Sequence, residues 1–232
     1  MSVRDELKNL RREVLEVRDM GCFKKCKRWT KDPLLTGEHL YQYNTLEDLN
    51  ERRLHDAEIL GGVCANRNPK TILEIGTAEG HTTALLAQNA PQATVHTVNI
   101  LPEEIRQGGK LVTDGFSREK IGWYYRQQNC SNVRQIWANT ATWEPDIGPI
   151  DVAFIDGCHD AEFVYNDTRK VLKHAHKGTV ILWHDFNLEL VDTYPWIAAA
   201  CRGVERLFEE GLIEGRVLHL RDSWVGYYVV MR

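Results

Sequence analysis

The chain has 232 residues, a formal net charge of −4 at pH 7 and a hydrophobic content of 43%. This length suits one well-buried α/β domain with extensions and excludes two full enzyme domains. The ordinary composition and the weakly acidic charge give no general attraction to nucleic acid, so a nucleic-acid partner is not expected.

The sequence shows no sign of a membrane span or a secretory signal. No apolar run approaches the roughly 20 residues of a spanning helix. The segment from Met1 to Glu6 is charged where a signal peptide needs an apolar core. We therefore expect a cytoplasmic protein whose six cysteines stay reduced. Cys22 and Cys26 form one close pair, which makes a poor zinc site without a second pair nearby.

Residues 1–44 are expected to form an N-terminal helical extension and a basic linker. Apolar residues recur at three-and-four spacing between Val3 and Asp19, which predicts an amphipathic helix. These residues are Leu7, Leu10, Val14 and Val17. The narrow apolar stripe favours packing against the body of the protein, and the alternative is a homo-oligomer formed through this helix.

Residues 45–232 are expected to form the catalytic domain. Thr45 is the predicted cap of a helix that reaches about Ala65. From Thr71 the pattern alternates between strand and helix, which predicts a parallel sheet with both faces covered. The expected strands are 71–75, 94–99, 133–137, 151–155 and 179–183. The expected helices are 81–88, 117–128, 161–174 and 196–210.

The end of the chain follows a different pattern. Segments 216–220 and 224–231 are joined by a three-residue turn, and so short a connection makes an antiparallel pair. The fold class is therefore α/β and Rossmann-like, a mostly parallel seven-stranded sheet with a C-terminal antiparallel hairpin. In such a sheet the ligand crevice lies at the carboxyl ends of the strands.

A glycine turn follows the first strand of this domain. The apolar strand contains Glu74, and Gly76 and Gly80 then let the backbone turn sharply before a helix starts at His81. The Gly-x-Gly-x-x-Gly spacing of a pyrophosphate site is missing, and Glu79 would repel a phosphate. A positively charged ligand without phosphate suits this turn, and S-adenosylmethionine fits that description.

Two later blocks end predicted strands with acidic and histidine side chains. Residues 151–159 read Asp-Val-Ala-Phe-Ile-Asp-Gly-Cys-His, and residues 180–185 read Val-Ile-Leu-Trp-His-Asp. Together with the glycine turn, this order resembles the class I S-adenosylmethionine-dependent methyltransferases. The two blocks look like the subgroup with Phe-Ile-Asp-Gly-x-His and His-Asp motifs, which is similar to methyltransferase domain family 24. The resemblance runs from about Asp48 to Met231.

The resemblance implies a cofactor role for residues at four strand ends. The positions that match the methionine-binding turn are Glu74, Gly76, Thr77 and Gly80. Asn99 matches the position of the ribose-binding carboxylate, where an amide offers one acceptor oxygen instead of two. Asn139 and Thr140 match the adenine-contacting position, and Asp156 lies at the same crevice.

The resemblance also implies an acceptor site. In metal-binding relatives an acid at the position of Asp156 and groups at Asp185, His184 or Asn187 hold a divalent ion, which is Mg²⁺ or Mn²⁺ here. The nitrogen of His184 suits Mn²⁺, Fe²⁺ or Zn²⁺ better than Mg²⁺. In the metal-free alternative Asp185 orients His184 for proton transfer. His159 matches the position of the base in metal-assisted enzymes, so His159 and His184 are the predicted catalytic residues.

The expected function is an S-adenosylmethionine-dependent methyltransferase that acts on a hydroxyl of a small molecule. Segment 101–128, with aromatic side chains at Trp123, Tyr124 and Tyr125, is the expected place of substrate recognition, although core packing explains these aromatic residues as well. The alternatives are transfer to nitrogen or to a macromolecule, and a non-catalytic module that binds S-adenosylmethionine. A dehydrogenase is the remaining outside alternative.

Overall fold

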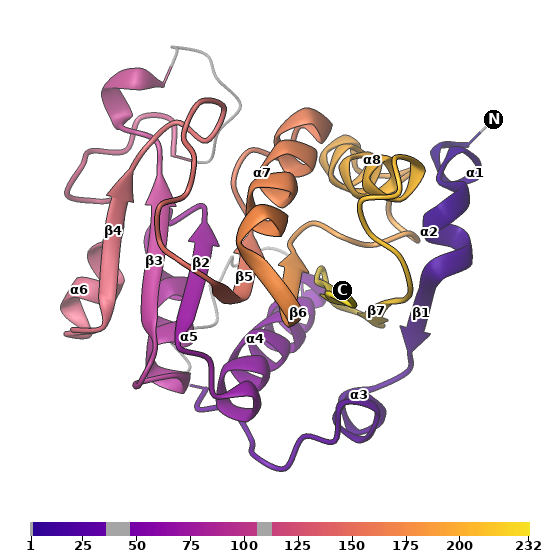
Figure 1. The fold of residues 1–232 in the computed structure, drawn as a ribbon, viewed down its shortest axis with the longest axis horizontal. Coiled ribbons are helices and arrows are strands. Elements are labelled where there is room, and N and C mark those ends of the chain that lie inside the picture. Colours follow the sequence, from indigo (N-terminus) through magenta and orange to yellow (C-terminus); the bar gives the residue numbers. More distant parts are fainter. Residues whose placement is uncertain (1, 36–46, 106–112) are drawn as a thin grey trace.

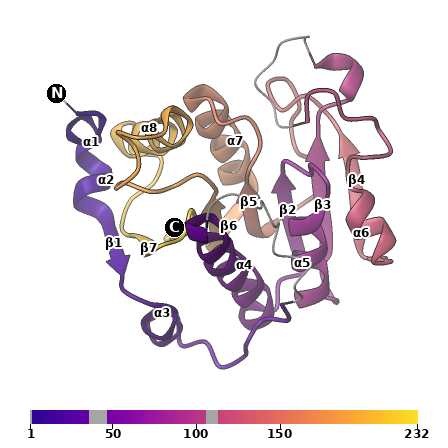
Figure 2. The same cartoon turned by 180° about the vertical axis from the view of Figure 1, so that it is seen from behind.

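An eight-stranded, mostly parallel sheet runs through the molecule, and helices cover both of its faces (Figures 1 and 2). The structure is a computed structural model that describes residues 2–35, 47–105 and 113–232. The strand order is β1-β7-β8-β6-β5-β2-β3-β4, with β1 and β4 at the two edges. No helix in these three ranges is long and apolar enough to cross a membrane.

The strands agree closely with the prediction. Their bounds are β1 Val14–Val17, β2 Thr71–Ile75, β3 Thr94–Asn99, β4 Val133–Trp137, β5 Ile150–Ile155, β6 Ala175–Trp183, β7 Val217–Leu220 and β8 Gly226–Val229. Strand β8 is antiparallel to both β6 and β7, and the remaining pairs are parallel. The mostly parallel sheet with a terminal hairpin is therefore confirmed, with one strand more than the seven expected.

The helices are α1 Val3–Glu6, α2 Lys8–Glu13, α3 Met20–Lys27, α4 Glu47–Arg67, α5 His81–Asn89, α6 Trp123–Gln127, α7 Ala161–His174 and α8 Pro195–Glu209, and Pro102–Glu104 form the short 3-10 helix η2. Figures 1 and 2, seen from opposite sides, show α7 and α8 on one face of the sheet and α4 and α5 on the other. Because both faces are covered, the central part of the sheet is apolar: residues 180–183 of β6 are each 0% exposed.

The predicted helix from Val3 to Asp19 is wrong in its second half. After the short helices α1 and α2, residues Val14–Val17 form the edge strand β1, which pairs in parallel with β7. The β-branched valines favour an extended chain, and the open edge of β7 supplies the partners for its backbone. The three-residue spacing of these valines looked helical in the sequence but belongs to the eighth strand of the sheet.

The N-terminal apolar stripe packs against the body of the same chain. Leu7 and Leu10 are 1% and 0% exposed. Glu205 of α8 accepts hydrogen bonds from the backbone N–H groups of Asn9 at 2.9 Å and Leu10 at 2.8 Å. Leu7 and Leu10 are thus buried within this chain, which agrees with the expected packing against the body of the protein.

Two further expectations concern boundaries. The predicted helix 117–128 is reduced to α6, because the N–H of Gly122 donates to the carbonyl of Ala78 at 2.7 Å and the chain turns there. The predicted cap Thr45, and with it the domain boundary between residues 44 and 45, lies outside the described residues.

Candidate active site

The glycine turn between β2 and α5 is closely surrounded by backbone. Gly76 has a φ of 104°, and a Cβ atom there would lie 1.9 Å from the carbonyl oxygen of Asp156. Gly80 has a φ of 88°, and a Cβ atom there would lie 2.9 Å from the Cα atom of Gly122. Both positions therefore require glycine for the close approach as well as for the backbone conformation.

Two predicted cofactor residues, Glu74 and Thr77, are buried and form hydrogen bonds within the protein. Glu74 is 0% exposed, and its Oε2 atom accepts hydrogen bonds from the hydroxyls of Thr83 and Thr97. Thr77 is 3% exposed and lies 2.7 Å from Thr97 between hydroxyl oxygens. Both side chains are therefore bonded within the protein, and the cofactor role of these two positions stays a prediction.

This buried network extends across the neighbouring strands. Gln135 of β4 donates to the hydroxyl of Thr77 at 3.0 Å and accepts from the hydroxyl of Tyr125 at 3.2 Å. Glu74 ends the network, and its Oε1 atom is buried with no hydrogen bond among the described residues. Burial raises the pKa of Glu74 to about 8, so this carboxyl group is mostly protonated at neutral pH.

Asn99 lies at the end of β3, as predicted, but its side chain is engaged with the protein. Its Oδ1 atom accepts from the N–H of Ala78 at 3.2 Å, and its Nδ2 atom donates to the carbonyl of Ile100 at 2.9 Å. Asn99 is 6% exposed. The amide therefore holds the glycine turn with the oxygen that the prediction assigned to the ribose.

Asn139 and Thr140 lie on the loop after β4 and are partly exposed. The Oδ1 atom of Asn139 accepts from the N–H of Ala141 at 2.9 Å, which closes a local turn. The hydroxyl of Thr140 donates to Asp167 of α7 at 3.4 Å, and the ammonium group of Lys170 donates to the carbonyl of Thr140. The structure thus places both residues at the expected sheet edge. Asp167 lies beside them through its contact with Thr140, and it is not among the site residues predicted from the sequence.

Segment 101–128 exposes few of its aromatic residues. Tyr124 and Tyr125 are 3% and 6% exposed, whereas Trp123 is 38% exposed. The ring of Tyr124 stacks on His81, with centroids 4.1 Å apart. Core packing explains the two tyrosines, and Trp123 is the one aromatic residue of this trio that a ligand could reach.

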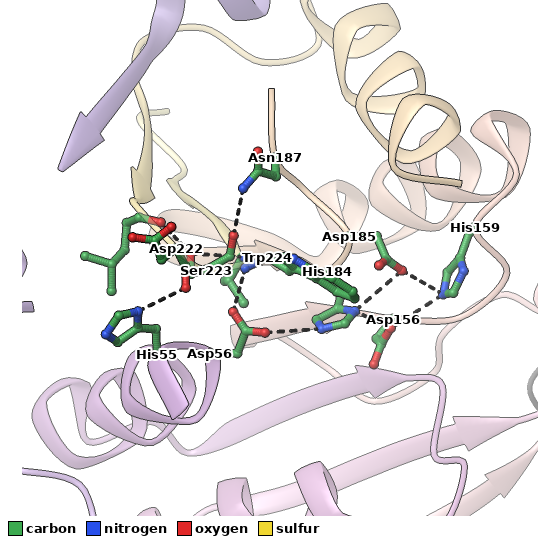
Figure 3. Close-up of polar contacts among 12 residues, drawn as sticks. His55, Asp56, Asp156, His159, His184, Asp185, Asn187, Asp222, Ser223 and Trp224 are labelled. Carbon is green, nitrogen blue, oxygen red and sulfur yellow. Dashed lines mark hydrogen bonds and ion pairs between the residues drawn. The ribbon is translucent and has the colours of Figure 1, made fainter. Parts of the chain in front are cut away.

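The predicted acceptor residues meet in one cluster at the carboxyl ends of β5 and β6 (Figure 3). The Nδ1 atom of His184 lies 3.1 Å from Asp156 Oδ1 and 3.5 Å from Asp185 Oδ2. The Nε2 atom of His159 lies 3.0 Å from Asp185 Oδ2 and 3.7 Å from Asp156 Oδ1. Asn187 is turned away from this cluster, because its Nδ2 atom donates to the carbonyl of Ser223.

The charges in the cluster reinforce one another. Burial alone would raise the pKa of Asp156, but the adjacent His184 and His159 outweigh burial and hold this pKa well below its usual range. Burial alone would lower the pKa of His184, but Asp156 and Asp185 raise it well above the usual value. The pKa of His159 is raised as well, because its contacts with the same two carboxylates outweigh burial.

The donor atoms also fit a divalent cation. Asp156, His184 and Asp185 each offer one atom, and these atoms lie within 4.8 Å of one another. His184 Nδ1 and Asp185 Oδ2 are buried without a hydrogen-bond partner in the described chain. Two carboxylate oxygens and one imidazole nitrogen suit Mn²⁺, Fe²⁺ or Zn²⁺.

One residue of the site was missed from the sequence. Asp56 of α4 is 5% exposed, and its Oδ2 atom lies 3.6 Å from His184 Nε2, on the side of the imidazole away from Asp156 (Figure 3). Its helix precedes every recognised motif, and an acid among the many charges of α4 carries no local signal. The one indication in the sequence that Asp56 has a special role was its place on the apolar face of that helix, where an acid is buried.

The comparisons with known proteins agree with this geometry. The model of a methyltransferase domain family, Methyltransf_24, matches residues 73–186. This range begins inside β2, before the glycine turn, and ends one residue after Asp185. No curated protein sequence matches the chain.

Several solved structures share the fold. The SAH-bound methyltransferase PaMTH1 of Podospora anserina has 19% identity and a TM-score of 0.58, with 90% of this chain and 93% of that chain covered. The O-methyltransferase TomG of Streptomyces achromogenes, which is involved in tomaymycin synthesis and was solved with SAM, has 17% identity and a TM-score of 0.53, with 77% and 80% covered. A putative O-methyltransferase of Klebsiella pneumoniae has 18% identity and a TM-score of 0.54, with 77% and 80% covered.

The fold and the domain match together define the class of the protein. The sheet order, the glycine turn after β2 and the acidic strand ends are those of a class I methyltransferase. Residues 73–186 match the Methyltransf_24 methyltransferase domain, and the protein is an S-adenosylmethionine-dependent methyltransferase.

Proposed function

We propose that the protein transfers the methyl group of S-adenosylmethionine to a hydroxyl oxygen of a small molecule. The observation that carries this proposal is the cluster of Asp156, His159, His184 and Asp185 directly beside the glycine turn. The closeness of Gly76 to the backbone of Asp156 brings the cofactor turn and the cluster to adjoining strand ends. A hydroxyl bound at the cluster would therefore lie near a methyl group held at the turn.

The reaction needs little from the protein beyond positioning and removal of one proton. The hydroxyl oxygen forms a bond to the methyl carbon as the carbon–sulfur bond breaks, and S-adenosylhomocysteine leaves with the bonding electrons. The hydroxyl proton goes to a base, and His159 is the residue that we assign to this role. Asp185 holds the ring of His159 at 3.0 Å and thereby fixes its orientation.

A divalent cation is part of the proposal. Asp156, His184 and Asp185 would hold it, and Asn99, Asn139 and Thr140 lie along the cofactor side. When bound, the cation lowers the pKa of a hydroxyl that it contacts. The metal-free alternative gives the same residues to proton transfer, and in it the shorter contact of Asp185 favours His159 over His184 as the oriented ring.

The weakly acidic charge of the chain and the limited exposure of the cluster both favour a small molecule as the methyl acceptor. The side chains of the cluster are only partly exposed, between 3% and 32%, and the net charge of −4 gives no general attraction to nucleic acid. TomG, which shares the fold, is an O-methyltransferase involved in tomaymycin synthesis.

Substitution of Asp156 tests the proposal. In Asp156→Asn, S-adenosylmethionine binding measured by calorimetry should stay within about threefold, whereas transfer of labelled methyl to a panel of hydroxylated metabolites should fall by roughly 10²–10⁴-fold. Asp160→Asn is the matched control, because Asp160 is an exposed acid in the same loop. Asp156→Asn that transfers methyl groups as fast as the original chain would refute the assignment.

The alternatives give different results in the same assay. Transfer to amines or macromolecules, with none to hydroxyls, would favour the second acceptor class. Cofactor binding without transfer to any acceptor would favour a binding module.

A further inference from the structure

Asp56 is a buried carboxylate that the proposed reaction does not use directly. It lies in the middle of α4 and is 5% exposed. Its Oδ1 atom accepts from the backbone N–H of Trp224 at 2.7 Å. Its Oδ2 atom has no hydrogen-bond partner in the described ranges, and His184 Nε2 lies 3.6 Å away. A buried carboxylate oxygen is costly unless a donor faces it, and this imidazole nitrogen is such a donor.

The two nitrogens of His184 face different partners. Nδ1 faces Asp156 and Asp185, which are the residues of the candidate cation site. Nε2 faces Asp56 across the ring (Figure 3). A proton on Nε2 leaves the lone pair of a neutral imidazole on Nδ1, where a cation can accept it.

We propose that Asp56 is a positioning residue of the active site, which keeps a proton on Nε2 of His184 and thereby directs Nδ1 toward the Asp156–Asp185 side. This inference rests on the proposed function in its account of what Nδ1 binds. The placement of the proton by Asp56 is a separate statement that can be measured without a cation.

The C-terminal hairpin fixes the direction of the Asp56 carboxylate. The bond from the Trp224 N–H holds Oδ1, which leaves Oδ2 to face His184. The adjacent His55 binds the same turn through the carbonyl of Asp222 at 3.0 Å and lies apart from His184 (Figure 3). The turn between β7 and β8, distant in sequence from every motif, thus helps to orient a histidine after β6.

Asp56→Asn tests this role with little change of shape. The side-chain oxygen of the amide must stay toward the N–H of Trp224, which needs an acceptor, so the NH₂ group faces His184. His184 Nε2 must then accept, and the proton of a neutral ring moves to Nδ1. Asp56→Ala removes the carboxylate altogether, and thermal unfolding of each variant shows that it is folded before it is compared.

Two measurements on the full chain decide the inference. ¹⁵N NMR of the His184 ring, recorded at a pH high enough to make this ring neutral, should show a proton on Nε2 in the original chain and none on Nε2 in Asp56→Asn. Calorimetry with Mn²⁺ alone should show binding weakened by about 10–100-fold in Asp56→Asn, which is the usual effect of removing a partner of a metal-binding histidine. His55→Ala is the matched control, since it loosens the same turn and should change neither result.

The outcomes distinguish the role of Asp56 in placing the proton from the binding of a cation. If Nε2 keeps its proton in Asp56→Asn, or if His55→Ala has the same effect, Asp56 has no specific role and the inference is overturned. If the original chain binds no Mn²⁺ but the NMR result is as expected, the cation is removed from the proposed function while the role of Asp56 in placing the proton stands.

Discussion

Glu74 lies on β2 and Asp156 directly follows the neighbouring parallel strand β5, and the surroundings of these two carboxyl groups are opposite. Glu74 is fully buried, receives two threonine hydroxyls and has its pKa raised to about 8 by burial. Burial acts on Asp156 too, but two histidines outweigh it and hold the pKa of Asp156 well below its usual range. One carboxyl group is neutral at pH 7 and the other is ionised.

This difference separates the two halves of the site. On the cofactor half, the polar side chains of Glu74, Thr77 and Asn99 turn inward and stabilise the glycine turn. On the acceptor half, His184 and Asp185 keep buried atoms without hydrogen bonds that face one another. The atoms of the acceptor half are thus placed to contact a ligand, whereas the glycine turn is held mainly by bonds within the protein.

Gly76→Ala should have the largest effect, because the two halves meet there. The added Cβ atom would lie 1.9 Å from the carbonyl oxygen of Asp156, at a φ of 104°. We expect a loss of at least about 3 kcal/mol in the free energy of unfolding, from the clash and the left-handed backbone together. Denaturant unfolding measures this loss.

Gly148→Ala is the control for Gly76→Ala. Its φ of 75° is also positive, but nothing lies within 4 Å of the added atom. It should cost only about 1 kcal/mol. Equal losses of unfolding free energy in the two variants would mean that the close approach of β2 to β5 at Gly76 does not affect stability.

His159→Gln should reduce turnover by about 10²–10⁴-fold while the affinity for S-adenosylhomocysteine stays unchanged. The reason is that His159 belongs to the acceptor half alone. His176 provides the control, since it forms a similar pair with Asp151 at the other end of β5, with 2.9 Å between Nε2 and Oδ1. His176→Gln should keep full turnover, and a loss of cofactor affinity in His159→Gln would contradict the division into halves.

Glu74→Gln should change how stability depends on pH. Because the pKa of Glu74 lies above its ordinary 4.5 in the folded chain, the folded state keeps a proton that the unfolded chain loses between pH 4.5 and about 8. Stability therefore falls as the pH rises through this interval, by up to about 1.4 kcal/mol per pH unit from this group. The variant should lack this fall, as measured by unfolding at pH 5 and pH 8, and parallel profiles would disprove a neutral Glu74.

Asn99→Asp should have the smallest effect, an improvement of about tenfold in affinity for S-adenosylhomocysteine. A carboxylate keeps the bond from the Ala78 N–H, and its second oxygen, which repels the carbonyl of Ile100 where the amide donated to it, is an acceptor for a ribose hydroxyl. The improvement should vanish for a cofactor analogue without ribose hydroxyls. Unchanged affinity for the natural ligand would show that the ribose does not reach residue 99.

Much of the fold was predictable because its signals are local. Apolar runs bounded by turns gave the bounds of β2, β3 and β4, and the amphipathic pattern gave α7. Strand β1 was not predictable in this way, since its four residues become a strand only because β7 has an open edge. Neighbouring structure outweighed a local helical spacing there.

The site was predictable to a different degree in each half. The ends of parallel strands meet at one edge, so Asp156, His184 and Asp185 could be brought together from their positions in the sequence. The inward direction of Glu74 and Thr77 could not be foreseen, because it depends on Thr83, Thr97 and Gln135 from other elements.

The most direct test of the two-part site is anomalous diffraction from crystals grown with S-adenosylhomocysteine and Mn²⁺. We predict S-adenosylhomocysteine along the turn from Gly76 to Gly80 and one manganese peak bounded by Asp156, His184 and Asp185. S-adenosylhomocysteine bound at the turn with no manganese peak at the cluster would contradict the cation-assisted acceptor half. S-adenosylhomocysteine bound away from the turn would contradict the account as a whole.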